Sequence, residues 1–85
     1  MNDIVMYTTA TCPYCRAAEQ LLHGRGIKDI SFVRVDIDPQ KRAEMMERTG
    51  RRSVPQIYIG NRHVGGFDDL QALDRSGELN HLLNA

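Results

Sequence analysis

Hydrophobic positions fall in short runs along the chain, and polar turns separate these runs. Residues 3–8 (DIVMYT) are rich in β-branched and other apolar side chains and stop at a polar turn, which predicts a short buried strand. Pro13 suits the first turn of a helix, where its missing N–H costs nothing. This helix is expected to continue to Arg25 and to stop at Gly26, after which Ile27 packs back against it. Its apolar face is expected to contain Cys15, Ala18, Leu21 and Leu22.

A second strand and helix follow. Residues 30–36 (ISFVRVD) predict the strand, and the Asp38-Pro39 pair suits the cap and first turn of the next helix. Residues 40–49 are expected to be helical up to Gly50. The positions of this helix expected to face the core are Ala43 and Met46.

The pattern changes in the second half. Two β runs within residues 56–64 (QIYIGNRHV) flank Gly60-Asn61, where glycine at the first loop position favours a type II′ hairpin turn. Asp68 and Gln71 fit a capping box that begins a terminal helix. Residues 76–83 (SGELNHLL) either continue this helix or form one more short turn.

The predicted order is therefore β-α-β-α-β-β-α. A strand, helix, strand unit is expected to be parallel with a right-handed crossover, whereas the hairpin that follows is antiparallel. We expect one α/β domain over residues 1–85, built as a four-stranded mixed β-sheet with helices on both faces.

Composition and charge argue against two classes of partner. The chain has 11 Lys and Arg against 11 Asp and Glu, so its formal net charge of zero provides no general attraction to nucleic acid or to an anionic membrane. No run approaches the ~20 apolar residues that cross a bilayer. The N-terminal MNDIVMYTT lacks the basic region and long apolar stretch of a signal peptide, so the expected location is cytoplasmic.

The only two cysteines, Cys12 and Cys15, lie three positions apart, which suits a structural disulfide, two metal ligands or a redox switch. A disulfide that closes so short a loop restrains the unfolded chain very little, and the cytosol keeps thiols reduced. A structural zinc site usually has four ligands, and His23, His63 and His81 lie at no recognisable ligand spacing. We therefore favour the redox switch and expect no metal.

The position of the pair before a helix predicts how the two thiols divide the work. Unpaired N–H groups and the helix dipole stabilise a thiolate at Cys12, so its pKa is expected below the ~8.5 of free cysteine. Arg16 would add to this effect if it points toward the sulfur. Cys15 is expected to be less exposed and to resolve the mixed disulfide that Cys12 forms. A C-x-x-C beside a β-α-β pattern indicates a thioredoxin-like site.

Three motifs together resemble a known family, the glutaredoxins of the short bacterial dithiol (CPYC) type. They are CPYC at residues 12–15, GRRSVPQIYI at 50–59, which resembles a Thr-Val-Pro segment, and VGGFDDLQAL at 64–73, which resembles a Gly-Gly-x-Asp segment. The resemblance implies a thioredoxin-like fold and a glutathione-dependent disulfide oxidoreductase, with Cys12 and Cys15 catalytic and glutathione as co-substrate. The implied partners are glutathionylated proteins and protein disulfides, with ribonucleotide reductase one candidate, and we expect a monomer.

The resemblance also implies a glutathione site. A cis bond before Pro55 would turn the Val54 backbone outward, where it pairs with the cysteinyl residue of glutathione like an added strand. Gly66 permits close approach of the ligand to the backbone. The N–H groups around Phe67 and Asp68, at a helix N-terminus, suit the γ-glutamyl carboxylate of glutathione, and the Asp68 side chain suits its ammonium group. A simple turn before the hairpin and a capping role for Asp68 are the structural alternatives.

The glycyl carboxylate of glutathione needs a cation, and here the chain departs from the family. Thr9 stands where many members have a lysine, so Arg42, or else Arg51 or Arg52, is expected to supply the charge. The full set of expected glutathione-binding residues is Thr9, Tyr14, Arg42, Ser53, Val54, Pro55, Gly66, Phe67 and Asp68.

Two other functions stay open at this point. Two chains could hold an iron–sulfur cluster through Cys12 and glutathione, but Pro13 and Cys15 argue against this because such members tend to have glycine after the first cysteine and no second one. Alternatively, the protein could be an electron donor that thioredoxin reductase reduces. The expected glutathione-binding residues Gly65, Gly66 and Asp68 argue against this alternative.

Overall fold

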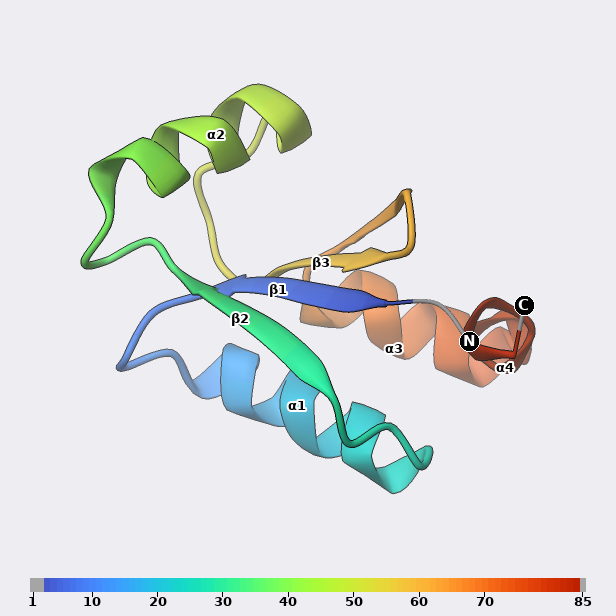
Figure 1. Cartoon of the computed structure of the whole chain (residues 1–85). Coiled ribbons are helices and arrows are strands. Elements are labelled where there is room, and N and C mark those ends of the chain that lie inside the picture. The colour runs from blue at the N-terminus through green and yellow to red at the C-terminus, as the bar shows by residue number, and fades with distance from the viewer. Residues whose placement is uncertain (1–2, 85) are drawn as a thin grey trace.

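The computed structural model describes residues 3–84, in which helices cover both faces of a four-stranded sheet (Figure 1). The elements are β1 (Ile4–Thr8), α1 (Pro13–Gly24), β2 (Ile30–Arg34), α2 (Pro39–Thr49), β3 (Gln56–Ile59), β4 (Arg62–Gly65), α3 (Phe67–Ser76) and α4 (Glu78–Leu83). The strand order is β2-β1-β3-β4, with β1 parallel to β2 and the other two pairings antiparallel. The predicted mixed α/β architecture is confirmed.

Alternation along β1 divides the core between the two faces of the sheet. Ile4 and Met6 belong to a large cluster with buried side chains of α1, α3 and α4. Tyr7 points the other way, into a smaller cluster under α2 with Val35, Met45 and Tyr58. Each fully buried side chain of this size stabilises the fold by about 1.5–3 kcal/mol relative to exposure.

The buried phenol of Tyr7 ties α2 to the sheet. Its oxygen accepts a hydrogen bond from Arg48 Nη1 at 2.8 Å and donates one to Glu44 Oε2 at 3.2 Å. The guanidinium of Arg48 also lies over the ring of Tyr58, 4.2 Å from its centroid. Burial raises the pKa of Tyr7 above its ordinary value, so the phenol is neutral and keeps its proton for Glu44.

These contacts set the rotation of α2, and the predicted core face is partly wrong. Met46 is half-buried against the smaller cluster as expected, but Ala43 is exposed and Met45 is fully buried instead. Because Glu44 and Arg48 turn toward the phenol of Tyr7, the side of the helix that carries Met45 faces the sheet and Ala43 faces solvent.

Two helix boundaries follow the prediction closely. The Asp38 carboxylate accepts from the backbone amides of Gln40 and Lys41 and caps α2. At the end of α1, Gly26 has a φ of +88°, and the Ile27 N–H donates to the Leu22 carbonyl at 3.0 Å. A left-handed Gly77 then separates α4 from α3, so the chain after residue 76 forms a short helix of its own. Within residues 3–84, no helix has the length and apolar character that crossing a bilayer would need.

The start of α3 and the end of β2 differ from the prediction. The N-cap of α3 is Gly66, whose N–H donates to the Asp69 carboxylate at 3.0 Å, so the expected capping box of Asp68 and Gln71 is wrong. The helix begins earlier because the chain already turns at Gly65, where φ is +113°. β2 ends at residue 34 rather than 36, because the next three residues form a turn.

Candidate active site

The two cysteines lie at the start of α1, directly after the loop that leaves β1. Cys12 is the N-cap residue, and its sulfur accepts the Cys15 N–H at 3.1 Å. The two residues are joined as a disulfide with Cα atoms 5.2 Å apart. Cys12 retains 8% of its surface exposed against 4% for Cys15, in the predicted order. The sequence prediction of a redox-active pair at a helix N-terminus is confirmed.

An ion pair holds the loop that carries Cys12. Arg34 donates from Nε and Nη2 to the Asp36 carboxylate at 2.7 and 2.8 Å, and Asp36 in turn accepts the Ala10 N–H at 3.1 Å. The hydrogen bonds from Arg34 are the main reason that the pKa of Asp36 lies well below its usual range. The ends of the two parallel strands are therefore linked just before the cysteine.

The loop between α2 and β3 faces the sulfur of Cys12. Its Val54–Pro55 peptide bond is cis, as the resemblance implied. The Val54 carbonyl oxygen lies 3.7 Å from Cys12 Sγ. Thr49 anchors the start of this loop, since its hydroxyl oxygen accepts the Arg51 N–H at 3.0 Å.

A cleft of about 320 Å³ lies at the meeting point of α1, this loop and the start of α3. Tyr14 and Phe67 supply its aromatic surface, with ring centroids 6.2 Å apart. Tyr14 is 65% exposed, so its ring is free to pack on a ligand. The residues that line the cleft are Tyr14, Arg51, Ser53, Val54, Pro55, Gly66, Phe67, Asp68 and Asp69.

The structure gathers most of the predicted glutathione-binding residues in this cleft, with two exceptions. Thr9, directly after β1, and Arg42, exposed on α2, are not among the lining residues. Of the three arginines considered as the cation for the glycyl carboxylate, Arg51 lines the cleft.

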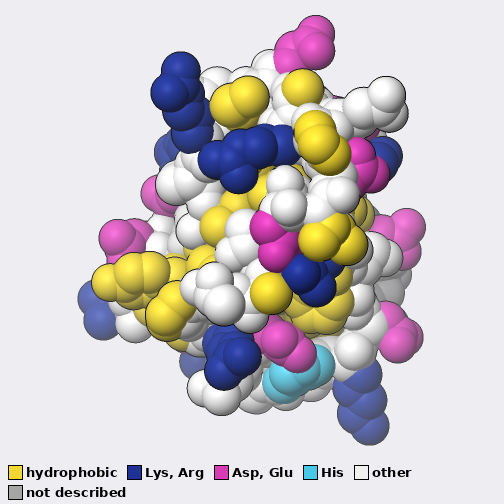
Figure 2. All heavy atoms as spheres, turned by 90° about the vertical axis from the view of Figure 1, so that its left-hand side faces the viewer, with side chains coloured by type: hydrophobic (Ala, Val, Ile, Leu, Met, Phe, Trp, Pro, Cys, Tyr) yellow, Lys and Arg dark blue, Asp and Glu magenta, His cyan; other side chains and the backbone are white. Residues whose placement is uncertain are grey.

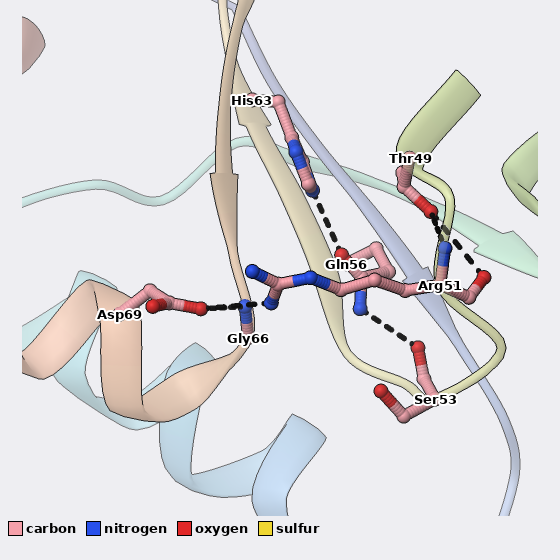
Figure 3. A network of polar contacts seen from close by, with 7 residues as sticks. All are labelled: Thr49, Arg51, Ser53, Gln56, His63, Gly66 and Asp69. Atoms are coloured by element: carbon pink, nitrogen blue, oxygen red, sulfur yellow. Dashed lines mark hydrogen bonds and ion pairs between the residues drawn. The ribbon is translucent and has the colours of Figure 1, made fainter.

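An ion pair between Arg51 and Asp69, which the sequence analysis did not anticipate, bridges two walls of the cleft (Figure 3). Arg51 Nη1 donates to Asp69 Oδ2 at 3.0 Å, and the same oxygen accepts the Gly66 N–H at 3.0 Å. The Gly66 N–H and then Arg51 lower the pKa of Asp69, so it is ionised at neutral pH. The available signal was the second aspartate after Gly-Gly, which lies three residues after the N-cap Gly66.

A second hollow, of about 540 Å³, contains Cys12 itself in its lining, together with Thr11, Pro13, Arg16, Ala17 and Gln20. Figure 2 views the molecule from the end where the loops leaving β1 and β2 lie, and there basic, acidic and hydrophobic side chains are interspersed.

Among residues 3–84, no three His, Cys, Asp or Glu side chains are grouped as a metal site would require.

Comparisons with known proteins agree on one family. The family model described as Glutaredoxin matches residues 4–64. A glutaredoxin of Neisseria meningitidis serogroup A is 51% identical over 84 residues, which is 99% of each chain. The solution structure of glutaredoxin from Brucella melitensis has a TM-score of 0.85 at 47% identity, covering 98% of this chain and 89% of that one. A crystal structure of a buckwheat glutaredoxin–glutathione complex has a TM-score of 0.89 at 28% identity, covering 98% of this chain and 77% of that one.

Proposed function

This chain belongs to the glutaredoxin family, and from that premise we propose that it is a glutathione-dependent thiol-disulfide oxidoreductase. Its substrates are glutathione mixed disulfides and protein disulfides. The observation that carries the proposal is the position of Cys12, which pairs with Cys15 and whose sulfur lies 3.7 Å from the carbonyl oxygen of Val54, a residue that lines the cleft.

In the proposed reaction the Cys12 thiolate attacks the glutathionyl sulfur of a mixed disulfide. The disulfide bond of the substrate breaks, the substrate leaves as a thiolate that takes up a proton, and Cys12 becomes glutathionylated. A second glutathione thiolate then attacks the glutathionyl sulfur, which releases the Cys12 thiolate and glutathione disulfide. Support for the nucleophile comes from the N-cap position of Cys12 and from the Cys15 N–H that reaches its sulfur at 3.1 Å.

For a protein disulfide, Cys12 first forms a mixed disulfide with the protein. The Cys15 thiolate then attacks Cys12, which breaks the bond to the protein and forms the disulfide seen here. The 5.2 Å between the two Cα atoms is within the range for such a bond and supports this assignment. Two glutathione molecules restore the dithiol.

Glutathione lies in the cleft with its cysteinyl residue along the Val54 backbone and its γ-glutamyl group at the start of α3. The N–H groups of Phe67 and Asp68 receive the γ-glutamyl carboxylate, and the exposed Asp68 side chain receives the ammonium. Tyr14, Ser53, Pro55 and Gly66 complete the lining.

The glycyl end extends toward Thr9 and a cation. Because the Arg51 guanidinium is engaged with Asp69 at the start of α3, Arg42 or Arg52 is the proposed partner of the glycyl carboxylate. We further assign the protein to the cytoplasm as a monomer, with glutathionylated proteins and ribonucleotide reductase among its candidate substrates.

Turnover of a small glutathione mixed disulfide by the reduced protein, with NADPH, glutathione and glutathione reductase, tests the proposal. Cys12→Ser is expected to abolish all activity, whereas Cys15→Ser retains deglutathionylation and loses most protein-disulfide reduction. Equal loss in both variants contradicts this division of labour. Turnover with thioredoxin reductase alone reverses the assignment of glutathione, and a visible absorption band in freshly purified protein would favour the cluster-binding alternative.

A further inference from the structure

The segment that faces Cys12 has few backbone anchors of its own. Residues 51–55 lie outside any helix or strand, and Pro55 has no N–H to donate. The backbone of Val54 faces the cysteine instead of pairing within a sheet. The carbonyl of the neighbouring residue Ser53 accepts a hydrogen bond from the side chain of Gln56.

Gln56 is a polar residue with no exposed surface, and both ends of its amide are used (Figure 3). Its Nε2 donates to the Ser53 carbonyl at 2.9 Å, and its Oε1 lies 2.8 Å from His63 Nε2. A carbonyl only accepts, so the NH₂ end of the amide faces Ser53 and the oxygen faces His63. The hydrogen bond between Gln56 and His63 therefore requires the imidazole proton on Nε2.

His63 belongs to β4, an edge strand of the sheet, and its own environment holds the ring in place. It packs 5.1 Å from the ring of Tyr58, and it is partly buried. Burial, followed by the charge of Arg51, lowers the pKa of His63, so the ring is neutral at pH 7 and carries a single proton. Given the partner at Gln56, that proton is on Nε2.

We propose that Gln56 and His63 are positioning residues for glutathione. The chain of hydrogen bonds from His63 through Gln56 to the Ser53 carbonyl fixes the peptide plane between Ser53 and Val54. This plane carries the Val54 N–H, which must face the cleft for a tripeptide to pair with it. The inference rests on the function proposed above. It means that a residue on an edge strand contributes to the affinity for glutathione without touching it.

A direct test uses the unaltered protein. Nitrogen-15 NMR of the imidazole distinguishes the two neutral tautomers, and we expect His63 to carry its proton on Nε2 at neutral pH. A proton on Nδ1 would overturn the inference, because Gln56 would then face an acceptor with its oxygen. This measurement needs neither catalysis nor a variant that folds.

Variants test the effect on glutathione. His63→Phe keeps a ring against Tyr58 but removes the donor, and it is expected to raise the KM for a glutathione mixed disulfide about five-fold, the equivalent of one neutral hydrogen bond of about 1 kcal/mol. The kcat and the rate at which iodoacetamide alkylates reduced Cys12 are expected to stay within about two-fold. His63→Gln, which restores an N–H donor, is expected to return most of the lost affinity, and His81→Phe on the exposed face of α4 serves as the control.

Each outcome decides between the claims. An unchanged KM in His63→Phe, or alkylation of Cys12 slowed by the same factor as turnover, would overturn the positioning role. Gln56→Met removes both hydrogen bonds and is expected to raise the KM at least as much as His63→Phe does. A smaller increase in KM would also count against the positioning role. Absence of turnover in the unaltered protein would refute the proposed function itself.

Discussion

Replacement of Gly65 by alanine places a methyl group where the structure has no room for one. The φ of Gly65 is +113°, which L side chains rarely adopt. An added Cβ would collide with the carboxylate of Asp69, with Asp69 Cγ at 2.9 Å, and would lie 3.1 Å from Arg51 Nη1. Because Asp69 is also the acceptor for the Gly66 N–H, its side chain moves aside only by giving up the cap of α3.

The expected cost has two parts. Holding a non-glycine residue in such a backbone conformation costs about 1–3 kcal/mol. Displacing Asp69 loses a charge-assisted hydrogen bond worth about 1.5–3 kcal/mol, for which we take the lower end because the Asp69 side chain is 45% exposed. We therefore expect Gly65→Ala to reduce the free energy of unfolding by about 2.5–4.5 kcal/mol, a large part of the stability of so small a domain.

Gly77→Ala is a matched control for backbone strain alone. Gly77 has a φ of +83° but nothing within 4 Å of an added Cβ, so its substitution is expected to cost about 1–2 kcal/mol. Urea unfolding followed by circular dichroism measures both variants. In an Asp69→Ala background the collision is absent, and the cost of Gly65→Ala is expected to fall to that of Gly77→Ala. Equal costs for the two glycines in the unaltered background would refute the role given to Asp69.

Three further changes separate stability from binding. Tyr7→Phe leaves Arg48 and Glu44 without their buried phenol, and urea unfolding is expected to show a loss of about 1–2 kcal/mol, against almost none for the exposed Tyr14→Phe. The lowered pKa of Asp69 means that its carboxylate stabilises the fold above its unfolded pKa and that this contribution is lost as the pH falls through the lower folded value. Asp69→Asn is therefore expected to weaken the dependence of the urea midpoint on pH in the acid range, and an unchanged pH profile would contradict the ion-pair assignment. Asp68→Ala is expected to raise the KM for glutathione mixed disulfides several-fold with no loss of stability, and an unchanged KM would refute the binding role of Asp68.

Local features of the sequence were sufficient for most of the secondary structure. Asp38 before a proline, and Gly26 after an apolar helical face, each satisfy backbone groups within a few residues, so neither boundary depends on distant parts of the chain. The rotation of α2 could not be predicted in this way. Met45 and Ala43 are both apolar, and only the contacts of the helix with Tyr7 on β1 select the one that is buried.

The candidate site shows the same division. The cysteine pair, the cis Val54–Pro55 bond and the glycines before α3 were recognised because each is a short motif of characteristic residues. Asp69 was missed because its role depends on where α3 begins, and the left-handed turn at Gly65 moves the N-cap from the predicted Asp68 to Gly66.

The sequence by itself determined the order of strands and helices, the redox pair at a helix N-terminus and the family, since these follow from hydrophobic spacing and contiguous motifs. Only the tertiary structure decided which residues meet across the sheet and the cleft. Arg51 reaches Asp69 over a separation of 18 residues, and His63 reaches Ser53 only through the buried Gln56. Such pairings depend on how strands and helices pack, because hydrogen bonds and ion pairs act over a few ångströms in space whatever the distance along the chain.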